Sequence, residues 1–311
     1  MEILINTPNL YIHLQDAVLI VQFLIDGLIH VTENAGGQWS TYSKFKGIPE
    51  NTYVNALIAS KHNVNTVYAV FNNHKNGDFK PYVMVSNDKG KNWKSISANL
   101  PKRGTVYDLA EDHIQSDLLF VGTEFGVFFS YNGGEEWKQL KAGLPTIAVK
   151  DIEIQEREDD LVLGTYGRGV YITDVAPIKE ISNKILNSEI HLFEVEPQPK
   201  KNYSEQKDWG NFKLMGDSHI YTPNEPNGLM IYYYLKNDSN SESKIIVSDN
   251  KNSSITEIIG SSSKGINRVV WDTKDAKPGQ YNITLKIGKK KITKKGIVEP
   301  AYKWAVGNNY N

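Results

Sequence analysis

Cysteine is absent from the 311 residues of this chain. A disulfide framework, a thiolate metal site and a cysteine nucleophile are therefore excluded. The seven histidines show no paired spacing of the kind that binds metals, and there is no phosphate-binding loop or dinucleotide motif. We therefore expect no metal site and no cofactor.

The chain also lacks an excess of charge of either sign. Lysine and arginine number 35 and aspartate and glutamate 36, which gives a formal net charge of −1. This balance provides no electrostatic reason to expect nucleic acid or an anionic membrane surface as a partner.

No apolar run is long enough to span a bilayer. The longest covers residues 17–25, which is too short for a membrane helix and more typical of a buried strand pair. The residues before it include Glu2 and Asp16 but neither lysine nor arginine, and no small-residue cleavage site follows, so a signal peptide is not indicated. Residues 1–26 lack the turn residues found elsewhere. We interpret them as an atypical segment of a damaged or truncated upstream sequence.

Internal repeats are the strongest positive signal. Three segments, 32–39, 86–93 and 130–137, share the order Ser/Thr, any residue, Asp/Asn, any residue, Gly, two residues, Trp. Their shared positions are Thr32, Asn34, Gly36 and Trp39; Ser86, Asp88, Gly90 and Trp93; and Ser130, Asn132, Gly134 and Trp137. The tryptophans are separated by 54 and 44 residues, close to the length of a four-stranded propeller blade.

Each repeat predicts a β-hairpin. An apolar strand enters, the Asp or Asn side chain bonds the backbone of the turn, and the glycine supplies a positive φ. The tryptophan opens the return strand, where it can fill the space between neighbouring blades. We therefore expect the three tryptophans to be equivalent and largely buried, and the Asp and Asn side chains to be structural.

The remaining strands predict an all-β fold. About three blades, a partial propeller, are expected over residues 27–177, followed by a linker at 178–225 that contains a short helix near Ser182. Residues 226–299 contain further strands with Ser, Asn and Gly turns, typical of an immunoglobulin- or fibronectin-like sandwich, and 300–311 form a tail. Closed propellers have four to eight blades, so the count indicates a fragment.

These repeats, with the runs Phe120–Gly126 and Gly164–Gly169, closely resemble the C-terminal blades of a bacterial family of large BNR/Asp-box proteins. Such proteins are often labelled sortilin-like or glycosyl-hydrolase-like. The resemblance implies further blades upstream of this chain, a small β-sandwich after the propeller, and a full-length protein that is exported to the periplasm, cell surface or medium.

The candidate binding residues lie outside the repeats. His74, Lys75 and Asp78 occupy a loop between two strands, where either a binding surface or a plain turn fits the sequence. Arg168, flanked by two glycines, could bind a carboxylate, but with no arginine cluster visible an interblade salt bridge is the simpler interpretation.

Catalysis would need a pair of carboxylates. Four acidic side chains lie on or beside predicted blade strands: Asp108, Glu111, Asp112 and Glu124. A glycosidase requires two of them about 5 to 9.5 Å apart across one cleft, and the sequence brings no two together. We count Glu124 with the binding residues and leave the catalytic residues unassigned. The lysines between 286 and 295 indicate a solvated hairpin.

Two function classes follow from these observations. The favoured one is a non-catalytic binding or scaffold module that recognises protein or glycan through the propeller face. The alternative is a glycoside hydrolase of the BNR or xyloglucanase-like type, or the non-catalytic remainder of one. No cofactor, nucleic acid or membrane span enters either.

Overall fold

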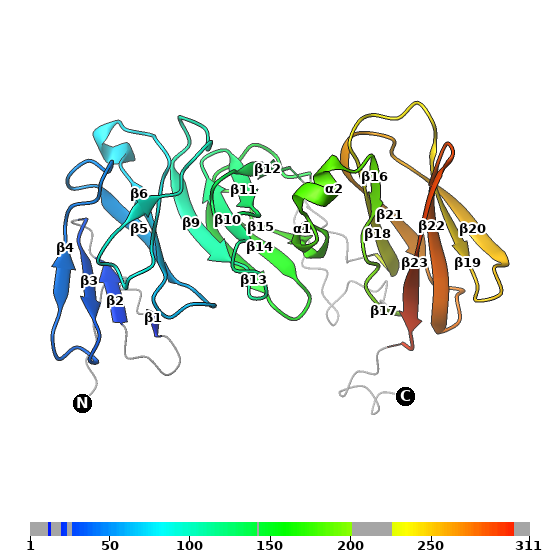
Figure 1. Ribbon diagram of the computed structural model, residues 1–311, viewed down its shortest axis with the longest axis horizontal. Coiled ribbons are helices and arrows are strands. Elements are labelled where there is room, and N and C mark those ends of the chain that lie inside the picture. The colour runs from blue at the N-terminus through cyan, green and yellow to red at the C-terminus, as the bar shows by residue number, and fades with distance from the viewer. Residues whose placement is uncertain (1–11, 14–19, 24–26, 142, 201–225, 302–311) are drawn as a thin grey trace, which may run out of the picture. The chain divides into compact units, whose positions relative to one another are not determined.

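A computed structural model describes residues 12–13, 20–23, 27–141, 143–200 and 226–301 (Figure 1). The chain divides into two compact units, residues 1–179 and 180–311, which are described separately. Most of the run at 17–25, the later part of the predicted linker and nearly all of the tail lie outside the described residues. No helix in the described ranges is long and apolar enough to cross a membrane.

The first unit consists of consecutive antiparallel sheets, each built from strands that follow one another in the chain. Its described strands are β1 (Ile12–His13), β2 (Ile20–Phe23), β3 (Ile29–Thr32), β4 (Ser40–Tyr42), β5 (Tyr53–Ala59), β6 (Val67–Asn72), β7 (Tyr82–Ser86), β8 (Lys94–Ser95), β9 (Val106–Glu111), β10 (Leu119–Thr123), β11 (Gly126–Ser130), β12 (Lys138–Leu140), β13 (Val149–Gln155), β14 (Asp160–Thr165) and β15 (Val170–Asp174). A one-turn 3-10 helix, η1 (His74–Asn76), interrupts the loop between β6 and β7. The predicted all-β fold is confirmed.

Within the described residues these strands form four sheets: β1–β4, β5–β8, β9–β12 and β13–β15. Strands β1 and β2 come from residues 1–26, which the count of about three blades had set aside. The first strands of successive sheets are neighbours, as in a propeller, and apolar clusters fill the spaces between sheets. Leu57 and Met84 of the second sheet, for example, pack against Ile29 and Val31 of the first.

The turns between the third and fourth strands make the same hydrogen bonds in the first three sheets. In the second sheet, Ser86 Oγ donates to Asp88 Oδ1 over 2.8 Å and accepts the N–H of Gly90 over 2.8 Å. Asp88 Oδ1 also accepts the N–H of Asn92 over 2.8 Å. The bonds from the Asn92 side chain and N–H, with those from Ser86 and the Lys91 N–H, lower the pKa of Asp88 although its slight burial opposes the shift. The Asp88 side chain is therefore held by hydrogen bonds within its own turn.

The equivalent bonds in the other two turns involve Thr32 with Asn34 and Ser130 with Asn132. The turns of the second and third sheets each pack on the sheet that precedes them. The Cβ position of Gly134 lies 2.8 Å from Ile96 Cβ, and the Trp137 indole N–H donates to the Ile96 carbonyl over 2.7 Å. The turns thus tie consecutive sheets together.

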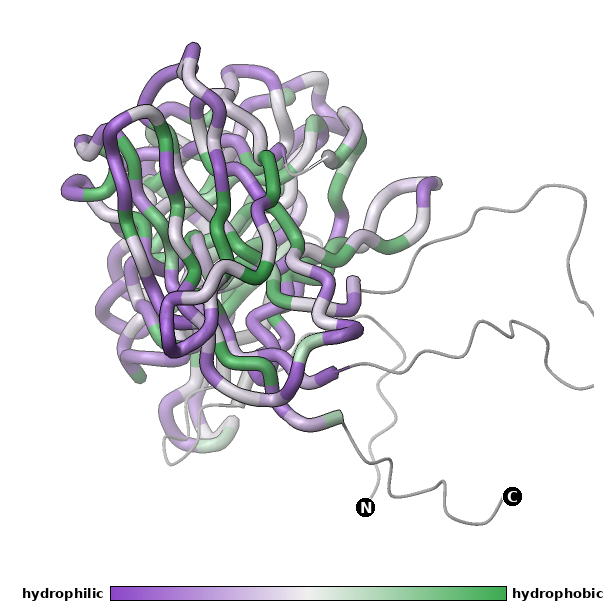
Figure 2. Tube along the Cα trace, turned by 90° about the vertical axis from the view of Figure 1, so that its right-hand side faces the viewer, coloured by the Kyte–Doolittle hydropathy of each residue, from purple (hydrophilic) through white to green (hydrophobic). Residues whose placement is uncertain are grey.

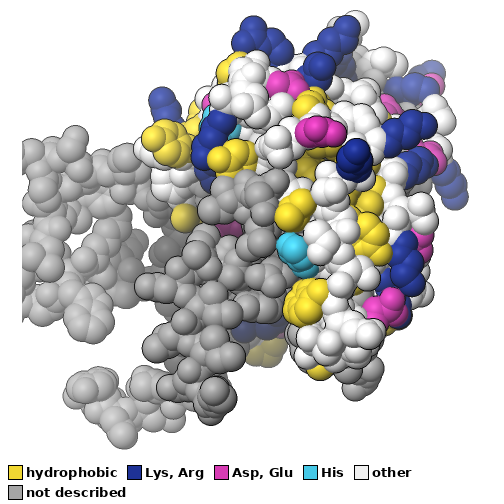
Figure 3. Space-filling model, turned by 90° about the vertical axis from the view of Figure 1, so that its left-hand side faces the viewer, with side chains coloured by type: hydrophobic (Ala, Val, Ile, Leu, Met, Phe, Trp, Pro, Cys, Tyr) yellow, Lys and Arg dark blue, Asp and Glu magenta, His cyan; other side chains and the backbone are white. Residues whose placement is uncertain are grey.

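The expectation that all three tryptophans are largely buried is wrong for Trp39. Trp137 is 3% exposed and Trp93 is half-buried against Phe45, whereas Trp39 is 42% exposed. The physical reason is that no described sheet precedes the first one. On the side of the unit that carries β3 and β4, hydrophobic side chains lie scattered among polar and charged ones (Figure 3).

The fourth sheet differs from the other three. After β15 the chain does not form a hairpin but enters a short helix, α1 (Ala176–Lys179). β15 is therefore an edge strand within the part of the chain that the structure describes.

The second unit is a two-sheet sandwich. One sheet has the order β16–β18–β21 and the other β17–β23–β22–β19–β20. Their bounds are β16 (Ile190–Leu192), β17 (Gln198–Pro199), β18 (Gly228–Leu235), β19 (Ser243–Ser248), β20 (Ser254–Gly260), β21 (Gly265–Asp272), β22 (Gly279–Ile287) and β23 (Lys290–Glu299). Alternating side chains from both sheets, such as Ile231, Tyr233, Ile245 and Leu285, form one core. The alternation is visible as successive green and purple segments along the strands in Figure 2.

Part of the predicted linker is ordered structure. Helix α2 (Asn183–Asn187) is preceded by Ser182, whose Oγ accepts the N–H of Ile185, so the predicted cap is confirmed. β16 and β17 also lie in the predicted linker, although they pair within the sandwich. The lysine-rich hairpin is formed by β22 and β23, where Lys294 pairs with Glu194.

Candidate functional site

The first strands of the second, third and fourth sheets line a cleft with a volume of about 480 Å³. β5, β9 and β13 form its walls. The lining residues are Asn55, Ala56, Ile58, Lys61, Tyr107, Asp108, Leu109, Ala110, Glu111, Lys150, Asp151, Ile152, Glu153 and Ile154. The volume falls in the range of small-molecule sites, and the lining combines aliphatic side chains with carboxyl, amine, phenol and amide groups.

Each of these strands contains a β-bulge at the same place. The pairing register shifts by one residue in β5, β9 and β13, which leaves one residue of each strand without a cross-strand partner. These residues are Asn55, Tyr107 and Lys150, and all three line the cleft. Bulges redirect side chains and occur next to active and binding sites. The repeat therefore presents three different polar groups at one level of the cleft.

Tyr107, the middle of the three bulge residues, contacts the other two across the sheets. Asn55 Nδ2 donates to the Tyr107 carbonyl over 2.5 Å, and Lys150 Nζ lies 3.1 Å from the centroid of the Tyr107 ring. The Tyr107 hydroxyl donates to Glu124 Oε2. Burial, followed by this bond to Glu124, raises the pKa of the Tyr107 phenol, and burial lowers the pKa of Lys150 although Glu124 opposes that shift.

The residue after each bulge is Ala56, Asp108 or Asp151, so that two consecutive sheets place a carboxyl at the same position. Asp108 accepts the N–H groups of Leu109 over 2.8 Å and Ile152 over 3.0 Å, and its carboxyl interacts directly with that of Asp151. Burial, partly offset by the two backbone bonds, and the neighbouring Asp151 raise the pKa of Asp108 to about 7.

The sequence-predicted binding residues gather on one class of turn. His74, Lys75 and Asp78 lie between β6 and β7, Glu124 between β10 and β11, and Arg168 between β14 and β15. Each turn connects the second and third strands of its sheet, so the five residues lie on equivalent turns of three consecutive sheets. Sequence analysis selected them one at a time and did not predict that they share an edge of the unit.

Two of these residues contact side chains at the starts of the strands that line the cleft. Lys75 Nζ lies 3.1 Å from the Tyr53 hydroxyl and 4.2 Å from its ring centroid, at the start of β5. Glu124 receives the bond from Tyr107 near the start of β9. The same turns also carry exposed aromatic rings, Phe79, Phe125 and Tyr166, which sequence analysis missed. Each of these rings follows the second strand of its sheet, and this regular spacing in the sequence could have identified them.

The other predicted residues have local roles. His74 Nδ1 lies 2.5 Å from Asn72 Oδ1. Asp78 accepts the Tyr82 hydroxyl over 2.6 Å; its partial burial raises its pKa, but the bonds from Tyr82, the Lys80 N–H and the Asn73 amide outweigh this and lower it. These contacts favour a structural role within the loop.

Arg168 is exposed in the turn between β14 and β15. The expected interblade salt bridge is absent, since Arg168 has no ion pair with any described residue. Its two glycine neighbours both have positive φ, which turns the side chain outward.

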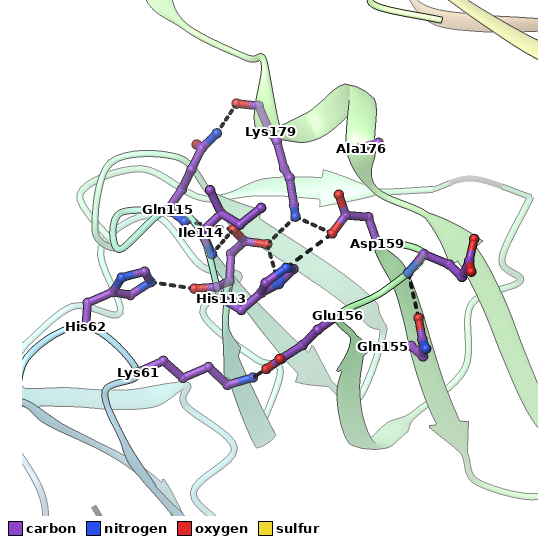
Figure 4. Close-up of polar contacts among 12 residues, drawn as sticks. Lys61, His62, His113, Ile114, Gln115, Gln155, Glu156, Asp159, Ala176 and Lys179 are labelled. Carbon is purple, nitrogen blue, oxygen red and sulfur yellow. Dashed lines mark hydrogen bonds and ion pairs between the residues drawn. The ribbon is translucent and has the colours of Figure 1, made fainter. Parts of the chain in front are cut away.

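A second polar cluster joins the turns at the opposite ends of the cleft strands (Figure 4). Asp112 is fully buried; its Oδ1 accepts the N–H groups of Ile114 and Gln115, and its Oδ2 lies 3.2 Å from Lys179 Nζ. Lys179 also pairs with Asp159, and His62 Nε2 lies 2.7 Å from the Asp112 carbonyl oxygen. Three sheets and helix α1 meet in this network.

The Glu111 side chain is also held by hydrogen bonds in this region. Its carboxylate accepts the Ser60 and Tyr68 hydroxyls, each over 2.9 Å, and the Lys61 N–H over 2.5 Å. Glu111 and Asp112, two of the catalytic candidates from the sequence, are thus held by structural bonds. Within the described ranges, no group of three or more His, Asp or Glu side chains has the arrangement of a metal site.

No protein-family model and no curated protein matches this sequence. Among solved structures, an ancestral GH74 enzyme is similar at 17% identity and a TM-score of 0.42, over 79% of this chain and 31% of the enzyme. A GH74 xyloglucanase from Xanthomonas campestris is similar at 9% identity and a TM-score of 0.38, over 91% and 45% of the two chains. A third, the dihydro-heme d1 dehydrogenase NirN in complex with DHE, gives 10% identity and a TM-score of 0.35, over 90% and 73%.

The chain therefore spans less than half the length of the two GH74 enzymes that it matches. At these identities and scores, function has to be argued from the site itself.

Proposed function

We propose that the first unit is a non-catalytic binding module whose cleft between β5, β9 and β13 takes a glycan. The observation that carries the proposal is the triple bulge, which directs Asn55, Tyr107 and Lys150 into one cleft. An amide, a phenol and an amine offer the donors and acceptors that sugar hydroxyls need.

The size of the cleft favours a glycan over a protein as the occupant. About 480 Å³ accommodates a small ligand, whereas a specific protein interface buries roughly 1,200–2,000 Å² of surface. The exposed rings Phe79, Phe125 and Tyr166 lie on turns at the end of the sheets where β9 and β13 start. Tyr107 and Lys150 lie near these strand starts, so the rings offer apolar faces beside a polar cleft.

The carboxyl pair supports binding rather than hydrolysis. Asp151 is near enough to Asp108 to raise the pKa of its carboxyl through a side-chain hydrogen bond, whereas a glycosidase keeps its two carboxyl groups about 5 to 9.5 Å apart, to accommodate the sugar or a water molecule. The alternative, a glycoside hydrolase, draws on the raised pKa of Asp108, which suits a general acid. Turnover of xyloglucan or another β-glucan that is abolished by Asp108→Asn would establish that alternative.

The binding test is a glycan-array screen of the full chain, followed by calorimetry with each hit. Lys150→Gln should weaken binding about tenfold or more, because it removes a charged donor from the cleft. Lys46→Gln is the matched control, since Lys46 is an exposed lysine of the same unit away from the cleft lining. Hits that bind both variants equally would place the ligand elsewhere and refute the assignment.

We also propose that the chain belongs to the BNR/Asp-box proteins and that the full-length protein is exported. The shared hydrogen bonds of the three turns support the first statement. The resemblance of the sequence to exported proteins supports the second, and cell fractionation with an antibody against the sandwich unit tests it.

A further inference from the structure

The connections at the two ends of the cleft strands differ in charge. Strands that pair in the second, third and fourth sheets run antiparallel, so the connections after the second and fourth strands lie at one edge of these sheets and those after the first and third strands at the other. We call the first the basic edge and the second the acidic edge. The described residues of the basic edge are 73–81, 96–105, 124–125, 141, 143–148 and 166–169, and those of the acidic edge are 60–66, 87–93, 112–118, 131–137 and 156–159.

The separation of charge between the two edges is large. The basic edge contains six Lys or Arg residues and two Asp or Glu residues, whereas the acidic edge contains four and eight. The formal charges are therefore +4 and −4, although the whole chain is nearly neutral. A surface with one sign of charge attracts ligands of the opposite sign.

The cations of the basic edge are available to a ligand. All six are exposed, and none forms an ion pair with a described residue. They are Lys75, Lys80, Lys102, Arg103, Lys141 and Arg168. The two carboxylates of this edge, Asp78 and Glu124, accept tyrosine hydroxyls instead. At the acidic edge, by contrast, Lys61 pairs with Glu156 over 2.7 Å.

Two exposed aromatic rings of the basic edge each have a cation beside them. Arg103 Cζ lies 5.5 Å from the centroid of the Phe79 ring. Lys150, at the bulge of β13 next to this edge, places its Nζ 5.7 Å from the centroid of the Tyr166 ring. Lys150 also lines the cleft, so the basic edge and the cleft share a cation.

Backbone hydrogen bonds hold these two rings in place. The Gly104 N–H donates to the Phe79 carbonyl over 2.8 Å, and the Tyr166 N–H donates to the Ala148 carbonyl over 2.9 Å. Each bond joins a turn that carries a ring to the connection before the first strand of a sheet. The pairs of ring and cation are therefore fixed before a ligand arrives, which lowers the entropic cost of binding.

We propose that the glycan bound by the first unit is a polyuronide, held along the basic edge with its carboxylates on the exposed cations. This inference rests on the proposed glycan binding and adds the chemical class of the glycan. A uronate carries its carboxylate on the sugar ring itself. A uronate whose apolar face lies on Phe79 or Tyr166 therefore brings its negative charge within reach of Arg103 or Lys150.

The same observations favour a polyuronide over a single-stranded nucleic acid, which also combines negative charge with rings that stack. In a nucleotide the ribose separates the phosphate from the stacking base, whereas the cations of the basic edge lie directly beside the aromatic rings. The guanidinium groups of Arg103 and Arg168 also match the two oxygens of a carboxylate.

The test compares oligosaccharides of galacturonate, guluronate and glucuronoxylan, each with its carboxyl-reduced neutral counterpart, by calorimetry with the full chain. We expect at least one acidic oligosaccharide to bind about tenfold or more tightly than its counterpart. The difference should shrink between about 0.01 M and about 1 M salt, because the Debye length falls from about 30 to about 3 Å.

Two double variants locate the bound carboxylates. Arg103→Gln/Arg168→Gln should weaken binding of the acidic oligosaccharide about fivefold or more. Lys91→Gln/Arg157→Gln is the matched control, because it removes the same charge from exposed residues of the acidic edge, and it should leave binding unchanged.

Three results would overturn the inference. They are neutral counterparts that bind as tightly as every acidic oligosaccharide, equal weakening by the two double variants, and tighter binding of an oligodeoxythymidylate than of any uronide, which would assign the basic edge to nucleic acid. Absence of binding by all the uronides would overturn it as well. The proposed glycan cleft fails separately, when the glycan array gives no hit that depends on Lys150.

Discussion

The three turn glycines form an internal series for measuring how tightly consecutive sheets pack. Gly36, Gly90 and Gly134 have nearly the same φ, +89°, +83° and +89°. Replacing each by alanine therefore costs about the same for the left-handed backbone, roughly 1–2 kcal/mol. Any difference among the three variants has to come from what the added methyl group meets.

The surroundings of the three methyl positions differ in a graded way. At Gly36 the nearest atoms belong to its own Trp39, at 3.7 Å. At Gly90 the methyl meets a terminal methyl of Val31 at 3.1 Å, and at Gly134 it meets Ile96 Cβ at 2.8 Å, an atom that cannot move without the backbone. Overpacking of this kind costs about 1–3 kcal/mol. We expect Gly36→Ala to lower the free energy of unfolding by about 1–2 kcal/mol and Gly134→Ala by about 2–5 kcal/mol, with Gly90→Ala between them.

Urea unfolding followed by tryptophan fluorescence measures the series, since every turn carries a tryptophan. The order of the three variants is the decisive result. Equal losses, or a larger loss for Gly36→Ala, would mean that the turns do not pack on the preceding sheet as described, and the reasoning from repeat equivalence would fail.

Three further predictions use the same unfolding assay. Trp137→Ala should cost about 3–5 kcal/mol as a core aromatic, and Trp39→Ala less than half of the measured Trp137 loss, because Trp39 is 42% exposed; similar losses would contradict this. Lys179→Ala should cost about 3–5 kcal/mol by removing the ammonium group that pairs with the Asp112 and Asp159 carboxylates. Lys61→Ala, which breaks an exposed pair, should cost no more than about 1 kcal/mol, and the reverse order would be inconsistent with the network. The folded-state pKa of Asp108 is raised, so the native state binds more protons than the unfolded state between about pH 4 and 7. Wild type should lose stability relative to Asp108→Asn as the pH rises through that window, and a flat difference would refute the raised pKa of Asp108.

The hairpins of the first unit were predictable because their signal is local. Ser86, Asp88 and Gly90 bond one another within five residues, so the chemistry of the turn is legible in the sequence itself. The Ser182 cap was predictable for the same reason. What each turn packs against was not, which is why Trp39 was expected to be buried.

The cleft could not be predicted, because its lining residues are brought together only by strand pairing. The repeat places Asn55, Tyr107 and Lys150 directly after equivalent valines, but nothing in the sequence marks them as bulge residues, since the bulges appear only when β5, β9 and β13 pair with their neighbours. Asp108 and Asp151 are 43 residues apart in sequence and come together only because they occupy the same register in consecutive sheets.

β1 was missed, and β2, although it lies in the run at 17–25 that was expected to form strands, was not counted as part of a blade. The segment that contains them lacks the glycine and asparagine turns that mark strand ends elsewhere. β16 was missed because its three residues are too few to show a period.

The packing of each turn on the sheet before it gives the first unit a direction of assembly. Gly90 and Trp93 meet the first sheet, and Gly134 and Trp137 meet the second, so every new hairpin finds its docking surface already synthesised. A chain that emerges from the ribosome N-terminus first can therefore add sheets one at a time, without waiting for distant residues. When a full-length chain refolds, a hairpin can form before the sheet that precedes it. Its tryptophan then remains in water until that sheet has formed. Synthesis and refolding of this unit are therefore expected to follow different routes to the same stack.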